Sequence, residues 1–320
     1  MKVVEVQKFG GPEVLQIIEE PDSAPQAGQV AVDVKAAGIN FADVMAREGR
    51  YPGVPSAPFR PGYEIAGVVT ARGEAVEGLQ EGTRVMAFVP GGGYTSRIVL
   101  NAADVIPLPD ALDFGPATAL LVQGLTAYFL LEAGDLQPGK SVMIASAAGG
   151  VGSLAIQIAK LKGAGKIIGL ASPSKHQRVR SLGADVALDY TQSGWAKQAL
   201  EATAGKGIDI FLDSQGDLGS EGFDALSQKA HWLIYGGQGQ RGNGLPAERL
   251  GIMIGKNMTL RGYSVYGDVA NFKRGLTEMF GWAASGKLQI DVESFPLAEV
   301  ARAQEAISHR QTTGKVVLIP

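Results

Sequence analysis

The chain has 320 residues, about twice the usual length of one domain, so its length alone favours two domains. It is 45% hydrophobic and 19% charged, which excludes a disordered chain, and its formal net charge of −3 at pH 7 excludes a nucleic-acid binder that depends on bulk positive charge. Cysteine is absent, which excludes disulfides, thiolate nucleophiles and zinc sites that need sulfur, and three scattered histidines (His176, His231 and His309) argue against an imidazole-based metal site.

The first ten residues alternate polar and apolar side chains and lack the hydrophobic stretch of a signal peptide, so we expect them to form a strand. No segment reaches the roughly 18 uninterrupted apolar residues of a membrane span. The longest apolar segment, 117–131, contains Gln123, Gly124 and Thr126, which predicts a buried helix. These observations favour a soluble, cytoplasmic protein without a membrane span.

Short strands separated by Gly and Pro dominate the first 120 residues. We predict these strands at 29–37, 65–71, 84–88 and 94–100. Strands at this spacing, without long helices between them, predict an antiparallel, barrel-like fold.

Strand and helix alternate from about residue 121 to 260. We predict strands at 141–145, 166–170, 186–189, 208–213 and 231–236, and helices at 150–161, 174–182, 194–203 and 222–227. Because the strands are almost continuously apolar, the pattern predicts a parallel, doubly wound α/β sheet.

The last sixty residues return to mixed elements, with helices at 269–285 and 297–310, a segment at 288–292 and a strand at 315–319. This tail could complete the first domain.

A glycine-rich turn joins a predicted strand to a predicted helix. The run Ala147-Ala148-Gly149-Gly150-Val151-Gly152 places small residues where a pyrophosphate would approach the backbone and bind the N–H groups that begin the helix. Gly152 would allow the helix to pack closely on the strand. Ala147 replaces the first Gly of the usual G-x-G-x-x-G pattern, and an ordinary tight turn is the alternative. The strand–turn–helix context favours a dinucleotide site.

The next predicted strand ends where an NAD enzyme carries an acidic residue for the ribose 2′-hydroxyl. No acid stands there; Ser172 supplies a hydroxyl, and Lys175 and Arg178 supply positive charge. Charge-assisted donors of this kind favour a 2′-phosphate, so we predict NADPH rather than NADH. The alternative is that both cations are ordinary solvated residues of a helix.

Short motifs of one protein family are spread along the whole chain. They are AGINFAD at 37–43, REGRYP at 47–52, PGYE at 61–64, LTAY at 125–128, AAGGVG at 147–152, LGAD at 182–185 and GKVVLIP at 314–320. Together, and in this order, they resemble the zinc-free, zeta-crystallin-like quinone oxidoreductase family of the medium-chain dehydrogenase/reductase superfamily. Residues 40–47 and 174–176 are similar to the branch that contains the vesicle amine transport protein.

The resemblance implies a doubly wound parallel-sheet (Rossmann) domain inserted into a mostly β, barrel-like (GroES-like) catalytic domain. We expect the catalytic domain at 1–122 and 261–320, and the NADPH-binding domain at 123–260. The resemblance also implies a zinc-free member, because zinc-dependent cousins have a His where this chain has Tyr63, a Cys within 40–43 and a lobe with four Cys. It further suggests a homodimer that forms through the nucleotide-binding domains.

Binding positions follow from the resemblance residue by residue. The implied cofactor contacts are Asn40, Thr126, Gly149, Gly150, Val151, Ser172, Lys175, Tyr190, Gly237, Gln238, Tyr263 and Arg310. Asn40 matches the residue beside the nicotinamide and the substrate, and Thr126 matches a carboxamide contact. Met45 stands where some quinone reductases have a Tyr that lines the substrate site, so the substrate preference of those enzymes does not transfer directly.

The predicted reaction needs few catalytic side chains, because a nicotinamide cofactor carries the hydride. Asn40 is our first candidate to stabilise a developing oxyanion, and Tyr51 and Tyr63 are candidate proton donors. The alternative for each tyrosine is a structural role. Asp43, Arg47 and Glu64 could equally form a buried polar network.

Three functions are compatible with these residues. The first is NADPH-dependent reduction of quinones or other activated α,β-unsaturated carbonyls, which accept hydride without a metal as Lewis acid. The second is reduction of an enoyl thioester, which uses the same hydride chemistry. The third is a non-catalytic NADPH-binding protein with a sensing or interaction role. The polar loop 236–246, with Arg241, is a candidate to close over the cofactor.

Overall fold

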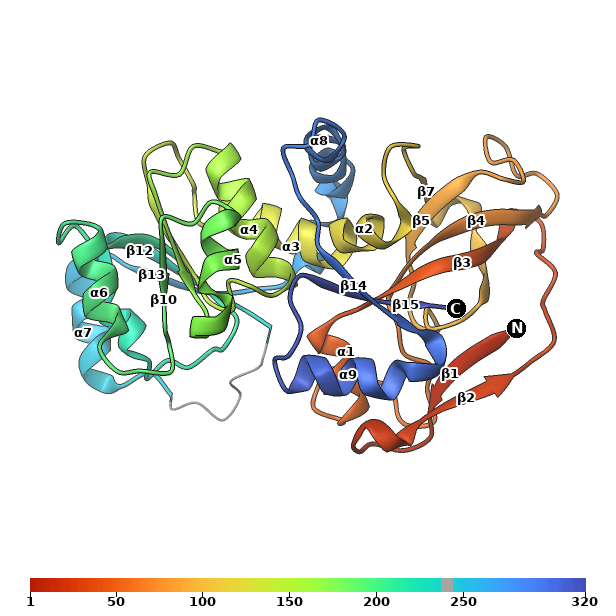
Figure 1. Ribbon diagram of the computed structural model, residues 1–320, viewed down its shortest axis with the longest axis horizontal. Helices are drawn as coiled ribbons and strands as arrows, with labels where there is room; N and C mark the ends of the chain where they lie inside the picture. The colour runs from red at the N-terminus through yellow and green to blue at the C-terminus, as the bar shows by residue number, and fades with distance from the viewer. Residues whose placement is uncertain (237–243) are drawn as a thin grey trace. The chain divides into compact units, whose positions relative to one another are not determined.

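The computed structural model describes residues 1–236 and 244–320, and the chain forms two compact units (Figure 1). The first unit contains Met1–Val122, Phe280–Ser285 and Ile290–Pro320, and the second contains Gln123–Met279 and Gly286–Gln289. The second unit is thus inserted between segments of the first. The domain limits expected at residues 122 and 260 stay a prediction.

Mostly antiparallel strands build the first unit. Its larger sheet has the order β14-β15-β3-β4-β5-β7, with β6 also paired to β3, and a separate pair joins β1 to β2. The strands are β1 (Lys2–Val6), β2 (Leu15–Glu19), β3 (Gln29–Ile39), β4 (Glu64–Arg72), β5 (Arg84–Phe88), β6 (Arg97–Asn101), β7 (Val105–Pro107), β14 (Val292–Pro296) and β15 (Lys315–Ile319). The antiparallel pairing of β15 with β3 brings the C-terminal strand into the N-terminal sheet, as the resemblance implies.

Apolar side chains of β3, β4, β5 and β15 form the core of this unit, together with Val300 and Ala303 of helix α9 (Val300–Ser308). Two shorter helices complete it, α1 (Phe41–Arg47) and α2 (Phe114–Ala119). Asn40 is the single residue between β3 and α1. Its backbone N–H donates to Asp43 Oδ2 at 2.6 Å, so the third residue of the helix holds the start of the helix in place.

A six-stranded parallel sheet forms the second unit, in the order β10-β9-β8-β11-β12-β13. The strands are β8 (Ser141–Ile144), β9 (Lys166–Leu170), β10 (Val186–Leu188), β11 (Ile208–Asp213), β12 (Leu226–Tyr235) and β13 (Thr259–Tyr263). The helices are α3 (Leu125–Ala133), α4 (Gly150–Leu161), α5 (His176–Ser181), α6 (Trp195–Ala202), α7 (Ala247–Lys256) and α8 (Phe272–Ala284), whose last residues belong to the first unit. Figure 1 shows α4 and α5 on one side of the sheet and α6 and α7 on the other.

This arrangement confirms the predicted fold class, a doubly wound parallel sheet inserted into a mostly β unit. The strand order turns back between β8 and β11, which is the switch point where sheets of this kind bind ligands. The bounds predicted for β5, α4, β9, β11 and β15 match the structure residue for residue.

The apolar segment expected as one buried helix is continuous but not uniform. It consists of α2, a π-helical turn at Leu120–Gly124, and α3. Among residues 1–236 and 244–320, only this helix, Phe114–Ala133, is long and apolar enough to cross a membrane, and most of it is buried inside the protein.

Two features of the second unit differ from the prediction. The helix predicted near 222–227 is a 3₁₀ helix at Glu221–Ala225, and β12 already begins at Leu226 rather than at residue 231. Gly222 packs against the Trp195 ring, where an added Cβ would lie 2.7 Å from Cη2. The edge strand β13 was not anticipated, because its residues are exposed or half-buried and do not form a continuous apolar run.

Candidate active site

The turn after β8 leads into α4 at the switch point of the sheet. Gly149 precedes the helix with an extended backbone (φ −81°, ψ −179°) and has no side chain that could cap it. The N–H groups of a first helical turn have no partner within the helix, and the helix dipole places partial positive charge there. Gly149, Gly150 and Val151 therefore present an end suited to a pyrophosphate.

Close backbone packing explains why this turn is made of glycine. A Cβ at Gly152 would lie 2.4 Å from the Ser146 carbonyl oxygen, so only glycine lets α4 pack on the end of β8, as predicted. A Cβ at Gly150 would lie 1.9 Å from Gln123 Oε1, so the Gln123 amide covers one side of this residue. A Cβ at Gly149 would lie 3.3 Å from the Ser146 carbonyl oxygen, so this position is less crowded than Gly150 and Gly152.

Three polar side chains that the sequence analysis missed lie at the ends of β8 and β11. Ser146, held at φ +51°, has its Oγ 2.8 Å from Ser214 Oγ, and Gln215 Nε2 donates to both hydroxyls at 3.1 Å. Polar residues at the carboxyl ends of parallel strands are the signal that could have identified them, since 208–213 was predicted as a buried strand.

A buried carboxylate holds the turn that carries Ser214 and Gln215. Asp213 Oδ1 accepts the backbone N–H groups of Gln215 at 2.8 Å and Gly216 at 3.1 Å, and its Oδ2 accepts Trp232 Nε1–H at 3.0 Å. Burial raises the pKa of Asp213, and these three donors oppose that shift. The carboxylate thereby fixes the backbone at the switch point.

The residues predicted to bind a 2′-phosphate follow β9 and β10. Ser172 lies two residues after the end of β9 and precedes the 3₁₀ helix Pro173–Lys175, where the Lys175 backbone N–H donates to the Ser172 carbonyl at 2.9 Å. Tyr190 follows β10 and is half-buried. Because β10, β9 and β8 are neighbours, these residues and the glycine turn lie along one edge of the sheet.

The remaining predicted cofactor residues belong to several different elements of the two units. Thr126 is buried in α3, and Tyr263 ends β13, where its hydroxyl donates to Asp268 Oδ2 at 2.6 Å. Burial is the main cause of the raised pKa of Tyr263, and the bond to Asp268 adds to it. Arg310 is an exposed residue of the first unit with φ +58°, just past the end of α9. Gly237, Gln238 and Arg241 lie outside the described residues.

A buried polar network surrounds Asn40 in the first unit. Asn40 Nδ2 donates to Glu64 Oε1 at 2.8 Å, and Lys315 Nζ donates to Asn40 Oδ1 at 3.1 Å. Lys315 also forms an ion pair with Glu64 Oε1 and donates to the Ile39 carbonyl at 3.1 Å. Glu64 Oε2 accepts the Val122 backbone N–H at 2.9 Å. Asn40 is 6% exposed, and Glu64 is fully buried.

The expected network of Asp43, Arg47 and Glu64 thus has a different composition. Lys315, which the sequence analysis did not select, provides the cation that pairs with Glu64, whereas Arg47 pairs with Glu48 at 3.0 Å. A lysine within the apolar strand 315–319 is an unusual residue type for a buried strand, and this was the available signal.

Asp43 also contacts Asn40, and its side chain is fully buried. Its Oδ2 accepts the Tyr94 hydroxyl at 2.9 Å as well as the Asn40 backbone N–H. Burial raises the pKa of Asp43 to about 7; these two donors and the charge of Lys315 lower it, and the charge of Glu64 raises it. Asp43 is therefore a carboxyl group that exchanges its proton near neutral pH.

The two predicted proton donors, Tyr51 and Tyr63, are half-buried in the same unit. Burial and then the charge of Asp43 raise the pKa of Tyr51, and the same causes raise the pKa of Tyr63 to about 12. Both phenols are therefore neutral near pH 7 and are weaker acids than free tyrosine.

Residues 1–236 and 244–320 contain no group of three or more His, Asp or Glu side chains that could hold a metal ion, and the chain has no cysteine. The donors around Asn40 are an amide, a lysine ammonium and a carboxylate already paired with that ammonium. This donor set does not fit zinc, which prefers Cys and His.

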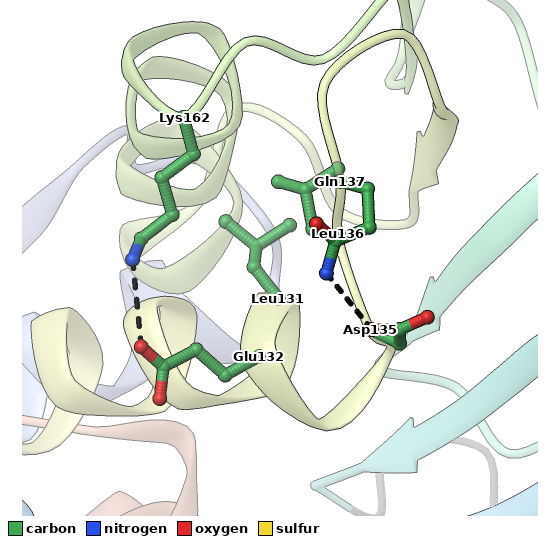
Figure 2. A pocket seen from close by; sticks show the side chains of 6 residues that line it. All are labelled: Leu131, Glu132, Asp135, Leu136, Gln137 and Lys162. Carbon is green, nitrogen blue, oxygen red and sulfur yellow. Dashed lines mark hydrogen bonds and ion pairs between the residues drawn. The ribbon is translucent and has the colours of Figure 1, made fainter.

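A surface pocket on the second unit is separate from these groups. Figure 2 shows the residues that line it, which are Leu131, Glu132, Asp135, Leu136, Gln137 and Lys162. The ammonium of Lys162 forms an ion pair with Glu132, with Nζ 3.5 Å from Oε1. It contains none of the residues predicted to bind cofactor or substrate. We therefore assign it no part in the site.

Comparison with known proteins settles the family. Residues 26–110 match the family of alcohol dehydrogenase GroES-like domains, and residues 182–318 match the family described as zinc-binding dehydrogenases. The chain is 34% identical to a quinone oxidoreductase of Pseudomonas aeruginosa over 100% of its own length and 99% of that protein. The chain belongs to the quinone oxidoreductase family of the medium-chain dehydrogenases/reductases.

Other members of this family and its neighbours show how far the likeness extends. The rat synaptic vesicle membrane protein VAT-1 homologue is 31% identical over 98% of this chain and 82% of its own. The crystal structure of Escherichia coli quinone oxidoreductase complexed with NADPH superposes with a TM-score of 0.91, at 33% identity and full coverage of both chains. The structure of CurK enoyl reductase has a TM-score of 0.86 at 27% identity, over 99% of this chain and 98% of its own. The resemblance noted in the sequence, including its vesicle-protein branch, is thus confirmed.

Proposed function

We propose that this member of the quinone oxidoreductase family catalyses the zinc-independent reduction of quinones or other activated α,β-unsaturated carbonyls by NADPH. Full-length likeness to quinone oxidoreductases, one of them solved with NADPH, supports an NADPH-dependent oxidoreductase. The observation that carries the finer proposal is the buried amide of Asn40, held by Glu64 and Lys315, a set of donors that does not fit zinc.

NADPH fits the polar edge of the parallel sheet. Gly149, Gly150 and Val151 would hold the pyrophosphate at the start of α4, and Ser172 and Lys175 would bind the 2′-phosphate. We assign the adenosine to Tyr190, and Thr126, Gly237, Gln238, Tyr263 and Arg310 remain proposed contacts from the resemblance. When bound, NADPH supplies a hydride, and a quinone that gains this hydride and one proton becomes the hydroquinone while NADP⁺ remains.

Orientation and polarity are the contributions we assign to the protein. We assign to the amide of Asn40, which is anchored on Glu64, the stabilisation of the negative charge that develops on the acceptor's oxygen. Tyr51 and Tyr63 stay neutral and serve as hydrogen-bond donors. Their raised pKa values make them slow acids, so we assign the proton to bulk water.

Enoyl-thioester reduction is the second candidate, favoured by the likeness to CurK enoyl reductase. It uses the same hydride chemistry with a different acceptor. Likeness to the VAT-1 homologue keeps a non-catalytic role in interaction or sensing as a third candidate.

We further propose a cytoplasmic homodimer that forms through the second unit. The edge strand β13 supports this, since its residues are exposed or half-buried and its outer side has no partner strand among the described residues. Sedimentation equilibrium should give twice the mass of one chain.

The deciding experiment follows nicotinamide absorbance when the purified protein is mixed with NADPH and an ortho-quinone, and repeats it with NADH. We expect turnover with a strong preference for NADPH. Turnover with an enoyl thioester but not with the quinone would select the second candidate. Cofactor binding without turnover on either acceptor would select the third.

A further inference from the structure

The ion pair of Lys315 and Glu64 is buried in the first unit, where apolar side chains would serve the stability of the fold as well. Both side chains are essentially unexposed, and Lys315 is the only charged residue in the five-residue strand β15. Replacing a buried ion pair by apolar residues is often neutral or stabilising, because desolvation offsets much of the attraction. The pair therefore calls for an explanation other than folding.

We propose that Lys315 and Glu64, lodged in the space left by Gly38, are positioning residues that fix the amide of Asn40 toward the acceptor. This inference rests on the proposed function, in which Asn40 contacts the acceptor.

The two ends of the pair contact different atoms of the amide. Glu64 Oε1 accepts from Asn40 Nδ2 at 2.8 Å, and Lys315 Nζ donates to Asn40 Oδ1 at 3.1 Å. A flipped amide would place Oδ1 against the carboxylate and Nδ2 against the ammonium, which is repulsive on both sides. Only one of the two amide orientations is therefore compatible with the pair.

The backbone holds the pair itself in place. Lys315 Nζ donates to the Ile39 carbonyl at 3.1 Å, and Glu64 Oε2 accepts the N–H of Val122 at 2.9 Å. Val122 lies within the π-helical turn Leu120–Gly124, a kind of irregularity often found at functional sites. The orientation of Asn40 is thus tied to β3 and to this turn.

The position of this ion pair explains why residue 38, in the motif at 37–43, is a glycine. A Cβ there would lie 2.4 Å from Glu64 Oε1 and 2.7 Å from Lys315 Cε. A side chain at residue 38 would displace both charged groups while leaving all of the polar atoms present. Gly38→Ala is therefore a probe of position rather than of charge.

A double-mutant cycle between Lys315 and Asn40 tests the inference. We would compare Lys315→Met, Asn40→Ala and the double variant, using NADPH and the ortho-quinone. Lys315→Met should lower kcat about 10- to 100-fold, the scale expected when a reacting group moves by ~1 Å, with the KM for NADPH unchanged. In the Asn40→Ala background the same substitution should have no further effect on kcat.

Lys315→Met leaves an unpaired buried carboxylate and could lose activity because it misfolds. A second variant controls for this effect. Glu64→Gln combined with Lys315→Met removes both charges and should fold, as judged by circular dichroism, yet should show the same loss of kcat. The inference would be overturned if Asn40→Ala has a lowered kcat while both this variant and Gly38→Ala keep the kcat of the wild type. If Asn40→Ala is as active as the wild type, the proposed role of Asn40 fails instead.

A readout independent of turnover completes the test. The side-chain amide resonances of Asn40, assigned by their loss in Asn40→Ala, should exchange slowly with solvent in the wild type. They should exchange at least 10-fold faster in the Glu64→Gln, Lys315→Met variant. Unchanged exchange would contradict a positioning role, even if the protein reduces no quinone and the proposed function is wrong.

Discussion

Tyr94 donates its hydroxyl hydrogen to Asp43 Oδ2 at 2.9 Å, and both side chains are fully buried. Burial raises the pKa of each group. A neutral Asp43 is the form that burial favours, and the Tyr94 hydroxyl and the Asn40 backbone N–H are the donors that favour its charged form. The balance leaves Asp43 titrating near pH 7, which has a direct consequence for stability.

The free energy of unfolding should contain a term from Asp43 that decreases as pH rises. The folded-state pKa is about 7, and the unfolded value is about 3.9, so between these pH values the folded protein holds the extra proton. This contribution is fully present below about pH 4 and is lost as pH rises through about 7. The loss is at most about 4 kcal/mol, at ~1.4 kcal/mol for each pKa unit.

Asp43→Asn removes this titration while keeping a side chain of similar shape. Urea unfolding at pH 4.5, 6 and 8 should show that the variant gains stability relative to the wild type as pH rises. A stability difference that stays constant across these pH values would show that Asp43 keeps an ordinary pKa.

Lys175→Ala should weaken NADPH binding about 10- to 100-fold and leave NADH binding nearly unchanged. The reason is that a charge-assisted hydrogen bond to the 2′-phosphate contributes about 1.5–3 kcal/mol, and NADH has no such phosphate. Fluorescence titration with both cofactors measures the effect. Lys197→Ala, at an exposed position on α6, is the matched control. Equal losses for both cofactors would remove Lys175 from the phosphate site.

Asn40→Ala should lower kcat about 100-fold and change NADPH affinity little. Removing one preorganised donor to a developing oxyanion typically has an effect of at least this size. Steady-state rates with the ortho-quinone give kcat, and fluorescence titration gives affinity. Asn101→Ala, on the exposed end of β6, should leave both quantities at their wild-type values. An unchanged kcat for Asn40→Ala would remove this residue from the site.

Local patterns determined how much of the structure could be predicted. Helix α4 and strands β9 and β11 were placed to the residue, because a glycine directly precedes each of them and both strands are almost continuously apolar. Gly152 was assigned its packing role because the contact is with Ser146 and Ala147, only five or six residues away along the chain.

Long-range contacts explain what was missed. Lys315 pairs with Glu64, 251 positions earlier in the sequence, and no local pattern connects the two. Ser146 and Ser214 meet only because β8 and β11 are neighbours in the sheet, although they are separated by β9 and β10 in the sequence. The strand β13 was missed for another reason: it lies at the edge of the sheet and lacks the apolar pattern of a central strand.

Gly152→Ala should destabilise the protein and weaken NADPH binding, whereas Gly251→Ala should do neither. An added methyl at residue 152 would lie 2.4 Å from the Ser146 carbonyl oxygen and 2.7 Å from the Ala147 Cα, and both of these are backbone atoms that cannot move independently of β8. The start of α4 must then shift away from the strand, which misplaces its N–H groups. We expect a loss of about 1–3 kcal/mol in the free energy of unfolding, as for other overpacking substitutions.

Gly251 is the matched control because it lies within α7 and a Cβ there meets no atom within 4 Å. Alanine at this position should stabilise the helix by about 0.5–1 kcal/mol, since glycine is the less favourable helix residue. Urea unfolding and NADPH titration of both variants distinguish a specific effect of the turn from a general effect of the substitution. If Gly152→Ala binds NADPH as tightly as Gly251→Ala does, close packing of α4 on β8 is not needed to place the N–H groups at the pyrophosphate.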